Sequence, residues 1–406
     1  MKHARPTVLY AAAVRDAAGV NASPGAVLVQ DGRVVAAGEP EGLPGDLVEQ
    51  AEAVQCDQFI VLPALVNAHT HLELTNLGPQ PYAPPTGFVG WAKMIRHRIA
   101  IADQFDDAMM AYNQGMEMLR DAGVGAVGDI AKSTLMFNSP FCQLAGQCYE
   151  EQFGLVDPII DQSLKKIRAG KSGIQPHAPY SAGPAVYAAA AASGRPVSTH
   201  LSEHEEEIAF VTELTGPMVD YLREIGRWDD TIAEHYGKGL SPVQWMRSHL
   251  ETSAKDGGWL VAHCNYVSDD DIAILADTNT SVAYCPLASE YFEHKDHRYR
   301  DMLAAGINVC LGTDSIVGTD PGDPQPLGLL SAMRRLYQRD QTDPATLLAM
   351  ATTHGARALR LEDKLATLQP GALAKFACVP IDRSSRVDPL VQVLTGQDPV
   401  EAIWLH

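Results

Sequence analysis

The chain has 406 residues, of which 46% are hydrophobic and 20% are charged, and its formal net charge is −19. These values are typical of a globular protein with an ample core, and the length allows several domains or one barrel-sized domain with an addition. The negative charge argues against nucleic acids and anionic membrane surfaces as partners. No apolar run approaches the ~18 residues of a transmembrane helix.

The cysteines and the N-terminus bear on the compartment. The seven cysteines are odd in number and scattered, and none forms a Cys-x-x-Cys pair, so the sequence offers neither a thiolate zinc site nor a redox motif. A short apolar run at 8–14 is interrupted by Arg15 and Asp16, and we interpret it as a strand rather than a signal peptide. We therefore expect a cytoplasmic protein.

Both ends of the chain contain short strand-like segments separated by turns. Asp31 and Gly32 form a two-residue hairpin signal between two such segments. Two strand-rich ends around a helical body predict one small β domain built from residues 1–60 with 365–406. The strand-like segments are 7–14, 26–30, 33–37, 372–380 and 402–405.

The body, residues 61–364, alternates apolar strand patterns with helical ones, which indicates parallel β/α units. Eight strands over this length predict a (β/α)₈ TIM barrel, in the α/β class. A doubly wound open sheet is the alternative, although no Gly-x-Gly-x-x-Gly follows the first strand. The predicted strands are 60–68, 124–130, 143–150, 173–177, 196–200, 259–263, 281–285 and 308–312, and the predicted helices include 102–121, 184–193, 203–214, 269–278 and 298–305.

Histidines and one acid stand at the ends of these strands. His69 and His71 are spaced i, i+2, so on a strand they lie on one face about 7 Å apart, and two such imidazoles suit Zn²⁺ or Fe²⁺. The carboxyl ends of barrel strands open on one face, where chemistry takes place. That face would also receive His177, His200, His263 and Asp314.

The chain resembles the amidohydrolase superfamily, in its purine- and cytosine-deaminase-like branch of mononuclear aminohydrolases. The matching motifs lie at the predicted strand ends, and the strand-rich termini resemble the family's split β-sandwich, so the resemblance covers essentially the whole chain. The motifs are residues 67–73, 177–180, 200–203, 263–264 and 312–315.

The resemblance implies a metal shell of His69, His71, His200 and Asp314 around one divalent ion, zinc first, with iron or manganese open. Three imidazoles and a carboxylate leave a position for water. The resemblance further implies that His263 orients this water and that Asp314 accepts its proton. It also implies that Glu203 protonates a ring nitrogen as the adjacent carbon is attacked.

Neighbouring residues receive other interpretations. Dinuclear relatives use a carboxylated lysine at the end of the fourth strand, where this chain has His177, so we expect a single metal and a substrate contact from His177. Glu73 is a second candidate to contact substrate or a metal ligand. The acids at 205–207 are interpreted as ordinary acids at a helix N-terminus and His204 as a solvated neighbour. The Pro-Cys-x-x-Cys signature of other zinc deaminases is absent.

The substrate implied by the resemblance is an aminopurine nucleoside or related heterocycle, from which ammonia is released. Residues 69–74, followed by 87–91 and an arginine-bearing helix, look most like aminofutalosine deaminases, then adenosine and S-adenosylhomocysteine or guanine-type deaminases. Trp91, Ile95 and Arg98 share a helix face; we hypothesise that Trp91 stacks on the substrate and that Arg98, or Arg96, pairs with its carboxylate. Ordinary packing of Trp91 with a surface arginine is the alternative.

Two loops depart from the family pattern and leave the substrate open, namely 285–290 and 316–324. An insertion at 216–253 is expected to form a lid. The alternatives are a chlorohydrolase or cyclic-amide hydrolase of the same superfamily, and a catalytically dead binding protein. The expected partners are a small heterocyclic substrate and, as an open alternative, a second copy in a homodimer.

Overall fold

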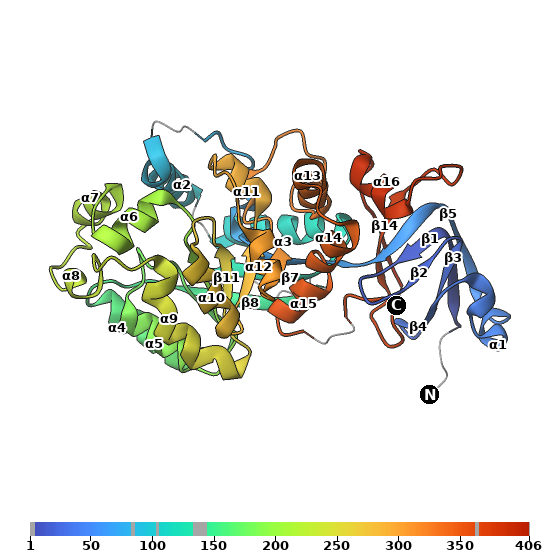
Figure 1. Ribbon diagram of the computed structural model, residues 1–406, viewed down its shortest axis with the longest axis horizontal. Helices are drawn as coiled ribbons and strands as arrows, with labels where there is room; N and C mark the ends of the chain where they lie inside the picture. Colours follow the sequence, from blue (N-terminus) through green and yellow to red (C-terminus); the bar gives the residue numbers. More distant parts are fainter. Residues whose placement is uncertain (1–4, 83–85, 103–104, 133–143, 362–364, 406) are drawn as a thin grey trace.

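A computed structural model describes residues 5–82, 86–102, 105–132, 144–361 and 365–405 of the chain (Figure 1). A β-sheet that contains both ends of the chain lies at one end of the molecule, and the α/β body forms the rest (Figure 1). Within the described residues, no helix is long and apolar enough to cross a membrane.

The terminal sheet has seven strands, in the order β15-β14-β5-β1-β3-β4, with β2 paired to β1. Both faces of this sheet are apolar. Successive residues of a strand point to opposite faces, because side chains alternate with a period of two. Val8 and Leu28 pack on one face, whereas Leu9 and Val27 pack on the other. The strands are β1 (Thr7–Arg15), β2 (Asn21–Ala22), β3 (Gly25–Gln30), β4 (Arg33–Gly38), β5 (Glu52–Pro63), β14 (Lys375–Pro380) and β15 (Glu401–Trp404).

The predicted strand 60–68 is wrong as a single element. Its first part ends β5, where Ile60 and Leu62 pair with β14 in the terminal sheet. The chain changes partners at Ala64, and β6 (Leu65–Thr70) pairs with β7 of the body. Both parts are apolar and buried, so periodicity carries no signal for the break. The described strands of the terminal region also form one continuous sheet, where the prediction was a sandwich.

The body contains two four-stranded parallel sheets, ordered β6-β7-β8-β9 and β10-β11-β12-β13. Parallel bridges connect them at both edges, from Ile174 to Val197 and from Thr70 to Asp314. The strands are almost wholly buried, as expected of parallel sheets covered by helices. The remaining strands are β7 (Val124–Ala131), β8 (Ala145–Gln152), β9 (Gly173–Pro176), β10 (Ser198–Leu201), β11 (Leu260–His263), β12 (Ser281–Tyr284) and β13 (Asn308–Leu311).

Helices follow most of these strands, and the prediction of interleaved β/α units with parallel sheets is confirmed. Predicted and observed elements differ mainly by one to three residues at their ends. The helices are α1 (Gly45–Val48), α2 (Gly87–Ala102), α3 (Phe105–Asp121), α4 (Ile159–Ala169), α5 (Pro184–Ala191), α6 (Glu205–Glu213), α7 (Pro217–Glu224), α8 (Ile232–His235), α9 (Pro242–Ser253), α10 (Asp269–Asp277), α11 (Pro286–Tyr291), α12 (Tyr299–Ala304), α13 (Leu330–Asp340), α14 (Pro344–Met350), α15 (Thr353–Ala358) and α16 (Pro389–Thr395), with short 3₁₀ turns at Pro40–Gly42, Leu72–Leu77, Ala254–Asp256 and Ile316–Gly318.

The insertion expected to form a lid divides into two parts. Helix α9 packs against α5 and α10 as part of the body. Helices α7 and α8 instead join an apolar cluster with α2, in which Phe88, Phe210 and Phe292 are buried together. The Tyr236 hydroxyl donates a hydrogen bond to the Pro179 carbonyl, 2.8 Å away, so that aromatic side chain serves packing. A lid role for the α7–α8 part stays a prediction.

Candidate metal centre and active site

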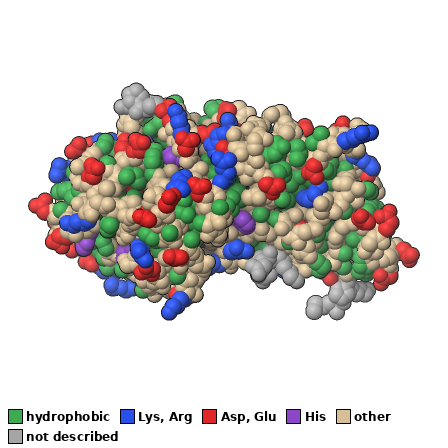
Figure 2. Space-filling model, in the orientation of Figure 1, with side chains coloured by type: hydrophobic (Ala, Val, Ile, Leu, Met, Phe, Trp, Pro, Cys, Tyr) green, Lys and Arg blue, Asp and Glu red, His purple; other side chains and the backbone are tan. Residues whose placement is uncertain are grey.

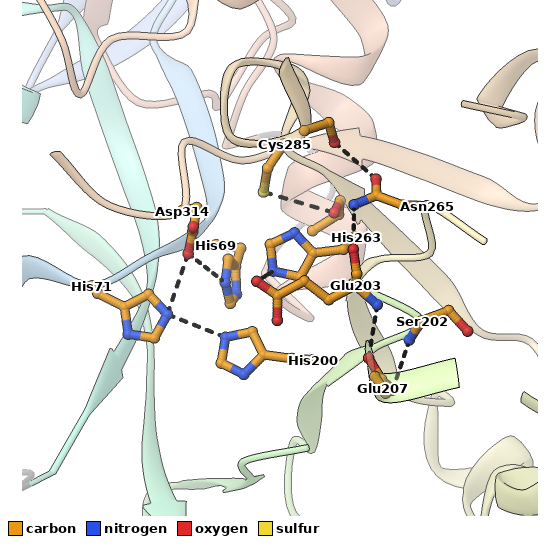
Figure 3. A network of polar contacts seen from close by, with 12 residues as sticks. His69, His71, His200, Ser202, Glu203, Glu207, His263, Asn265, Cys285 and Asp314 are labelled. Carbon is orange, nitrogen blue, oxygen red and sulfur yellow. Dashed lines mark hydrogen bonds and ion pairs between the residues drawn. The ribbon is translucent and has the colours of Figure 1, made fainter. Parts of the chain in front are cut away.

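Four imidazoles and one carboxylate converge at the carboxyl ends of β6, β10, β11 and β13 (Figure 3). His69, His200, His263 and Asp314 each offer a ligand atom, and these atoms lie within 4.8 Å of one another. The Nε2 atom of His71 lies 3.2 Å from Nε2 of His200 and 3.4 Å from Oδ1 of Asp314. We refer to these five residues as the histidine cluster.

The histidine cluster has the properties of a site for a divalent metal. Both ring nitrogens of His69 and the Nε2 atom of His263 are buried without a hydrogen-bond partner among the described residues. Burial lowers the pKa of His69, His71 and His263 well below the ordinary histidine value, so these rings are neutral and their lone pairs are available. Unpartnered neutral imidazoles beside a carboxylate fit a zinc-like ion.

Backbone contacts between the first and last strands of the body hold this arrangement. The amides of Thr313 and Asp314 donate to the His69 carbonyl, at 3.1 and 3.0 Å, and the His71 amide donates to the Asp314 carbonyl at 2.7 Å. Asp314 and His263 have φ angles of 62° and 74°, in the left-handed region that costs a non-glycine residue free energy. The fold therefore keeps the backbone of two residues of the histidine cluster in a conformation that they would rarely adopt alone.

Glu203 lies beside the cluster, with its Oε1 atom 3.7 Å from Nε2 of His263. Its side chain is buried, and burial, followed by the nearby Asp314 and Glu207 carboxylates, raises its pKa well above the ordinary value. This shift favours the protonated form of the carboxyl group. A buried carboxylic acid next to a metal site can donate that proton to a bound molecule.

A second carboxylate fixes the turn that carries Glu203. Glu207 accepts hydrogen bonds from the amides of Ser202 and Glu203, at 3.0 and 2.8 Å, and Ser202 has a φ of 52° (Figure 3). The Asn265 side chain donates to the Glu203 carbonyl at 2.9 Å and accepts from Ser289 at 2.8 Å. Glu203 is thus held through both its amide and its carbonyl.

The sequence interpretation of residues 204–207 was incomplete. Glu207 is fully buried, and Glu206 accepts hydrogen bonds from the amides of Phe88 and Val89 at the start of α2. His204 is partly buried and stacks on Phe88, with ring centroids 4.9 Å apart. The partners of His204 and Glu206 lie on α2, far away in the sequence, so the local sequence around 204–207 carries no signal for them.

His177 lies next to the histidine cluster, with its ring centroid 4.9 Å from that of His200. Its Nδ1 atom is 2.6 Å from the Ser181 hydroxyl, and its Nε2 atom is 3.9 Å from Oε1 of Glu151. The sequence analysis did not single out Glu151. Glu73 is mostly buried and accepts a hydrogen bond from the Lys132 amide at 3.2 Å.

The proposed substrate contacts on α2 have different environments. Trp91 donates from Nε1 to the Tyr291 hydroxyl at 2.9 Å and packs edge-on against Phe292. Arg98 is exposed, whereas Arg96 donates to the Tyr221 hydroxyl. Trp91 therefore has a packing role, and contacts of Trp91 or Arg98 with a substrate stay predictions.

Comparisons with known proteins agree with this geometry. The family model described as the amidohydrolase family matches residues 60–402. An aminodeoxyfutalosine deaminase of Deinococcus radiodurans is 26% identical over 360 residues, which cover 82% of this chain and 81% of the relative. A 5-methylthioadenosine/S-adenosylhomocysteine deaminase of Desulforudis audaxviator is 27% identical, covering 86% of this chain and 79% of that protein.

Solved structures show the same fold at lower identity. The aminofutalosine deaminase of Helicobacter pylori in complex with methylthio-coformycin superposes with a TM-score of 0.78 at 20% identity, covering 97% of both chains. An adenosine deaminase from Xanthomonas campestris with bound zinc has a TM-score of 0.71 at 19% identity, covering 97% of this chain and 90% of the other.

Proposed function

Because this chain belongs to the amidohydrolase family, we propose that it is a metal-dependent deaminase that releases ammonia from an aminopurine nucleoside. The named relatives that it resembles act in this class, and the predicted membership of the family is confirmed. We also propose that the two parallel sheets close into a (β/α)₈ barrel, which the bridges at both sheet edges support. The β domain of residues 1–60 with 365–406 is proposed as a separate unit, with its boundary moved to the end of β5.

We propose that His69, His71, His200 and Asp314 hold one divalent metal ion. The unpartnered nitrogens of His69 support this assignment, and zinc suits imidazole and carboxylate ligands, with iron or manganese as alternatives. A divalent ion in this site supplies Lewis acidity and a hydroxide nucleophile near neutral pH. In this proposal His263 orients the nucleophile and Asp314 accepts its proton.

The observation that carries the proposal is the buried Glu203 carboxyl group beside the histidine cluster, 3.7 Å from Nε2 of His263. Removal of an amino group from an amidine ring carbon requires a proton on the adjacent ring nitrogen, and a carboxylic acid supplies it. Glu203 then passes through its ionised form and must recover a proton before the next turnover. Glu207 and Asn265 keep the acid in place.

The test is ammonia release from a panel of aminopurine bases and nucleosides, measured with zinc-loaded and chelator-treated protein. We expect turnover of at least one nucleoside by the loaded protein and none after metal removal. Ammonia release that is independent of metal, or the absence of release from every aminopurine, would contradict the proposal. The KM of the Arg98→Ala variant for a carboxylated nucleoside tests the predicted contact of Arg98, and an unchanged KM refutes it.

A further inference from the structure

The backbone of His263, at the end of β11, is held in an unfavourable conformation. Its φ angle is 74°, and that of the next residue, Cys264, is 52°, so two successive residues lie in the left-handed region that side chains other than glycine rarely adopt. The pairing of β11 with β12 ends one residue earlier, at Ala262 and Ala283. On the β12 side, contacts from outside the sheet are therefore needed to hold His263 in this conformation.

His297, in the loop between α11 and α12, supplies such a contact. Its Nε2 atom lies 2.8 Å from the carbonyl oxygen of His263. The amide of Tyr299 donates a hydrogen bond to Nδ1 of His297 at 3.0 Å, and a ring nitrogen that accepts a hydrogen bond carries no hydrogen of its own. The ring hydrogen of His297 is therefore on Nε2, and the ring donates it to the His263 carbonyl.

The ring of His297 is itself held in place. It is buried and stacks on Tyr284 of β12, with ring centroids 3.7 Å apart and an angle of 18° between the planes. Tyr284 also stacks on Tyr299, with centroids 5.2 Å apart, and its hydroxyl accepts a hydrogen bond from Arg339 of α13 at 3.0 Å. The donor to His263 thus stands on a packed support formed by β12, α12 and α13.

The side chain of His263 faces the reactive centre. Its ring lies nearly parallel to that of His200, with centroids 5.5 Å apart, and its Nε2 atom is 3.7 Å from Oε1 of Glu203 (Figure 3). The direction of a side chain follows from the backbone conformation of its residue. A change of φ at His263 would therefore turn the ring away from its present neighbours.

We propose that His297 is a positioning residue for the deamination reaction. By donating to the His263 carbonyl, it holds the left-handed backbone of His263 and thereby the ring that orients the nucleophile. The inference rests on the proposed deaminase function and on the role of His263 within it. Because His297 acts only through His263, its loss should lower kcat, which depends on the orientation of the nucleophile, far more than KM.

The test compares His297→Asn with His297→Gln in zinc-loaded protein, using the aminopurine nucleoside that the wild type converts fastest. Gln reaches the position of Nε2 and keeps a donor for His263, whereas the shorter Asn keeps only an acceptor for Tyr299. Both variants lose the ring that stacks on Tyr284. We expect kcat to fall at least tenfold in His297→Asn and to stay within threefold of wild type in His297→Gln, with KM within threefold in both.

Urea unfolding separates this role from a purely structural one, which predicts equal losses of kcat in the two variants. His297→Phe keeps a stacking ring without the donor, and it should show the same fall in kcat even where His297→Asn does not fold. His294→Asn is the matched control, because His294 lies in the same loop and packs against Tyr266. It should retain the wild-type kcat, and all variants should retain the wild-type metal content.

Crystal structures of His297→Asn and His297→Gln measure the position of His263 without turnover. We expect the His263 ring to move by more than about 1 Å in the Asn variant, the scale at which misplacement impairs catalysis, and to stay in place in the Gln variant. Equal kcat values in the two variants, or a His263 ring that moves in neither, overturn the inference. A wild type that releases no ammonia contradicts the proposed function instead.

Discussion

The two parallel sheets of the body end in different chemistry. The strands of the β10–β13 sheet end in His200, His263 and Asp314, which gather neutral imidazoles around one carboxylate. The β6–β9 sheet contributes His69 and His71 to that cluster from its first strand, but its next two strands carry buried carboxyl groups near their ends, Asp129 on β7 and Glu151 on β8. One half of the face is thus suited to a cation, whereas the other half carries buried carboxyl groups beside it.

This difference shows that one fold places groups of different chemistry at equivalent positions. Both sets of side chains occupy the same structural position, the carboxyl end of a buried parallel strand, where folds of this kind place their chemistry. On the surface, acidic and basic side chains are both scattered over the visible face (Figure 2). The two halves differ instead in their buried groups.

Replacement of the Asp314 carboxylate should have the largest effect on metal content and turnover. Asp314→Asn removes the carboxylate of the histidine cluster, so we expect loss of the bound metal and a fall in turnover on the order of 10³-fold or more. Metal content per chain and ammonia release measure the two effects. Asp320→Asn, an exposed acid of the following loop, is the control and should retain both. A fully loaded and active Asp314→Asn would contradict the ligand assignment.

The next effect concerns the proton donor. Glu203→Gln keeps the shape of the side chain but cannot transfer a proton, so kcat should fall by roughly 10²- to 10⁴-fold. The metal content should stay at the wild-type value, which separates this variant from Asp314→Asn. Turnover that survives the substitution would favour a reaction that needs no proton on a ring nitrogen.

Glu207 should act by holding Glu203 in place and not by contacting the substrate. Glu207→Ala leaves the buried amides of Ser202 and Glu203 without acceptors, which costs about 1–3 kcal/mol each in unfolding free energy. Displacement of Glu203 should lower kcat by about 10- to 100-fold. Glu207→Gln keeps one acceptor oxygen and should give intermediate values. Urea unfolding and the separate values of kcat and KM provide the measurements, and a purely structural role predicts lower stability with kcat unchanged.

The smallest effect is expected for Asp129, near the end of β7, and concerns the free energy of unfolding. Burial raises the pKa of Asp129 well above its ordinary value, so the folded protein keeps a proton that the unfolded chain loses near pH 4. This side chain therefore costs stability as pH rises from about 4 through its folded pKa. Asp129→Asn cannot ionise and should raise the unfolding free energy at pH 8 by about 1–2 kcal/mol, with little change at pH 4.

Unfolding curves at the two pH values test this effect, with the exposed Asp121→Asn as control. A gain that is equal at both pH values would show that ionisation of Asp129 is not its cause. Turnover should stay within threefold of wild type, because the side chain is not placed among the groups that bind metal or donate protons.

Much of the metal site was predictable from the sequence. His69 and His71 share a face because side chains alternate along a strand, and the ends of parallel strands meet on one side of the sheet. The same two rules bring His200, His263 and Asp314 to that side. The structure brings these side chains together, as the positions of the strands along the sequence had predicted.

Long-range pairing was beyond these rules. The apolar run at 60–68 contains no mark of the change from β14 to β7 as partner, since both environments are buried. Glu150 and Glu151 are identical and adjacent, and alternation says only that they point in opposite directions. Which one faces His177 depends on how the sheet curves relative to its helices.

The sequence by itself determined most of the strands of the body, their parallel direction and the residue types at their ends, because periodicity and local propensity encode them. The tertiary structure decided which acids are buried and what they contact. Glu207 reaches its two amides within one turn, but only the pairing of β10 with β11 and of β11 with β12 brings Asn265 to Glu203 and Ser289 to Asn265. Burial and hydrogen bonding between distant segments arise from packing, and they place neighbouring acids in different environments.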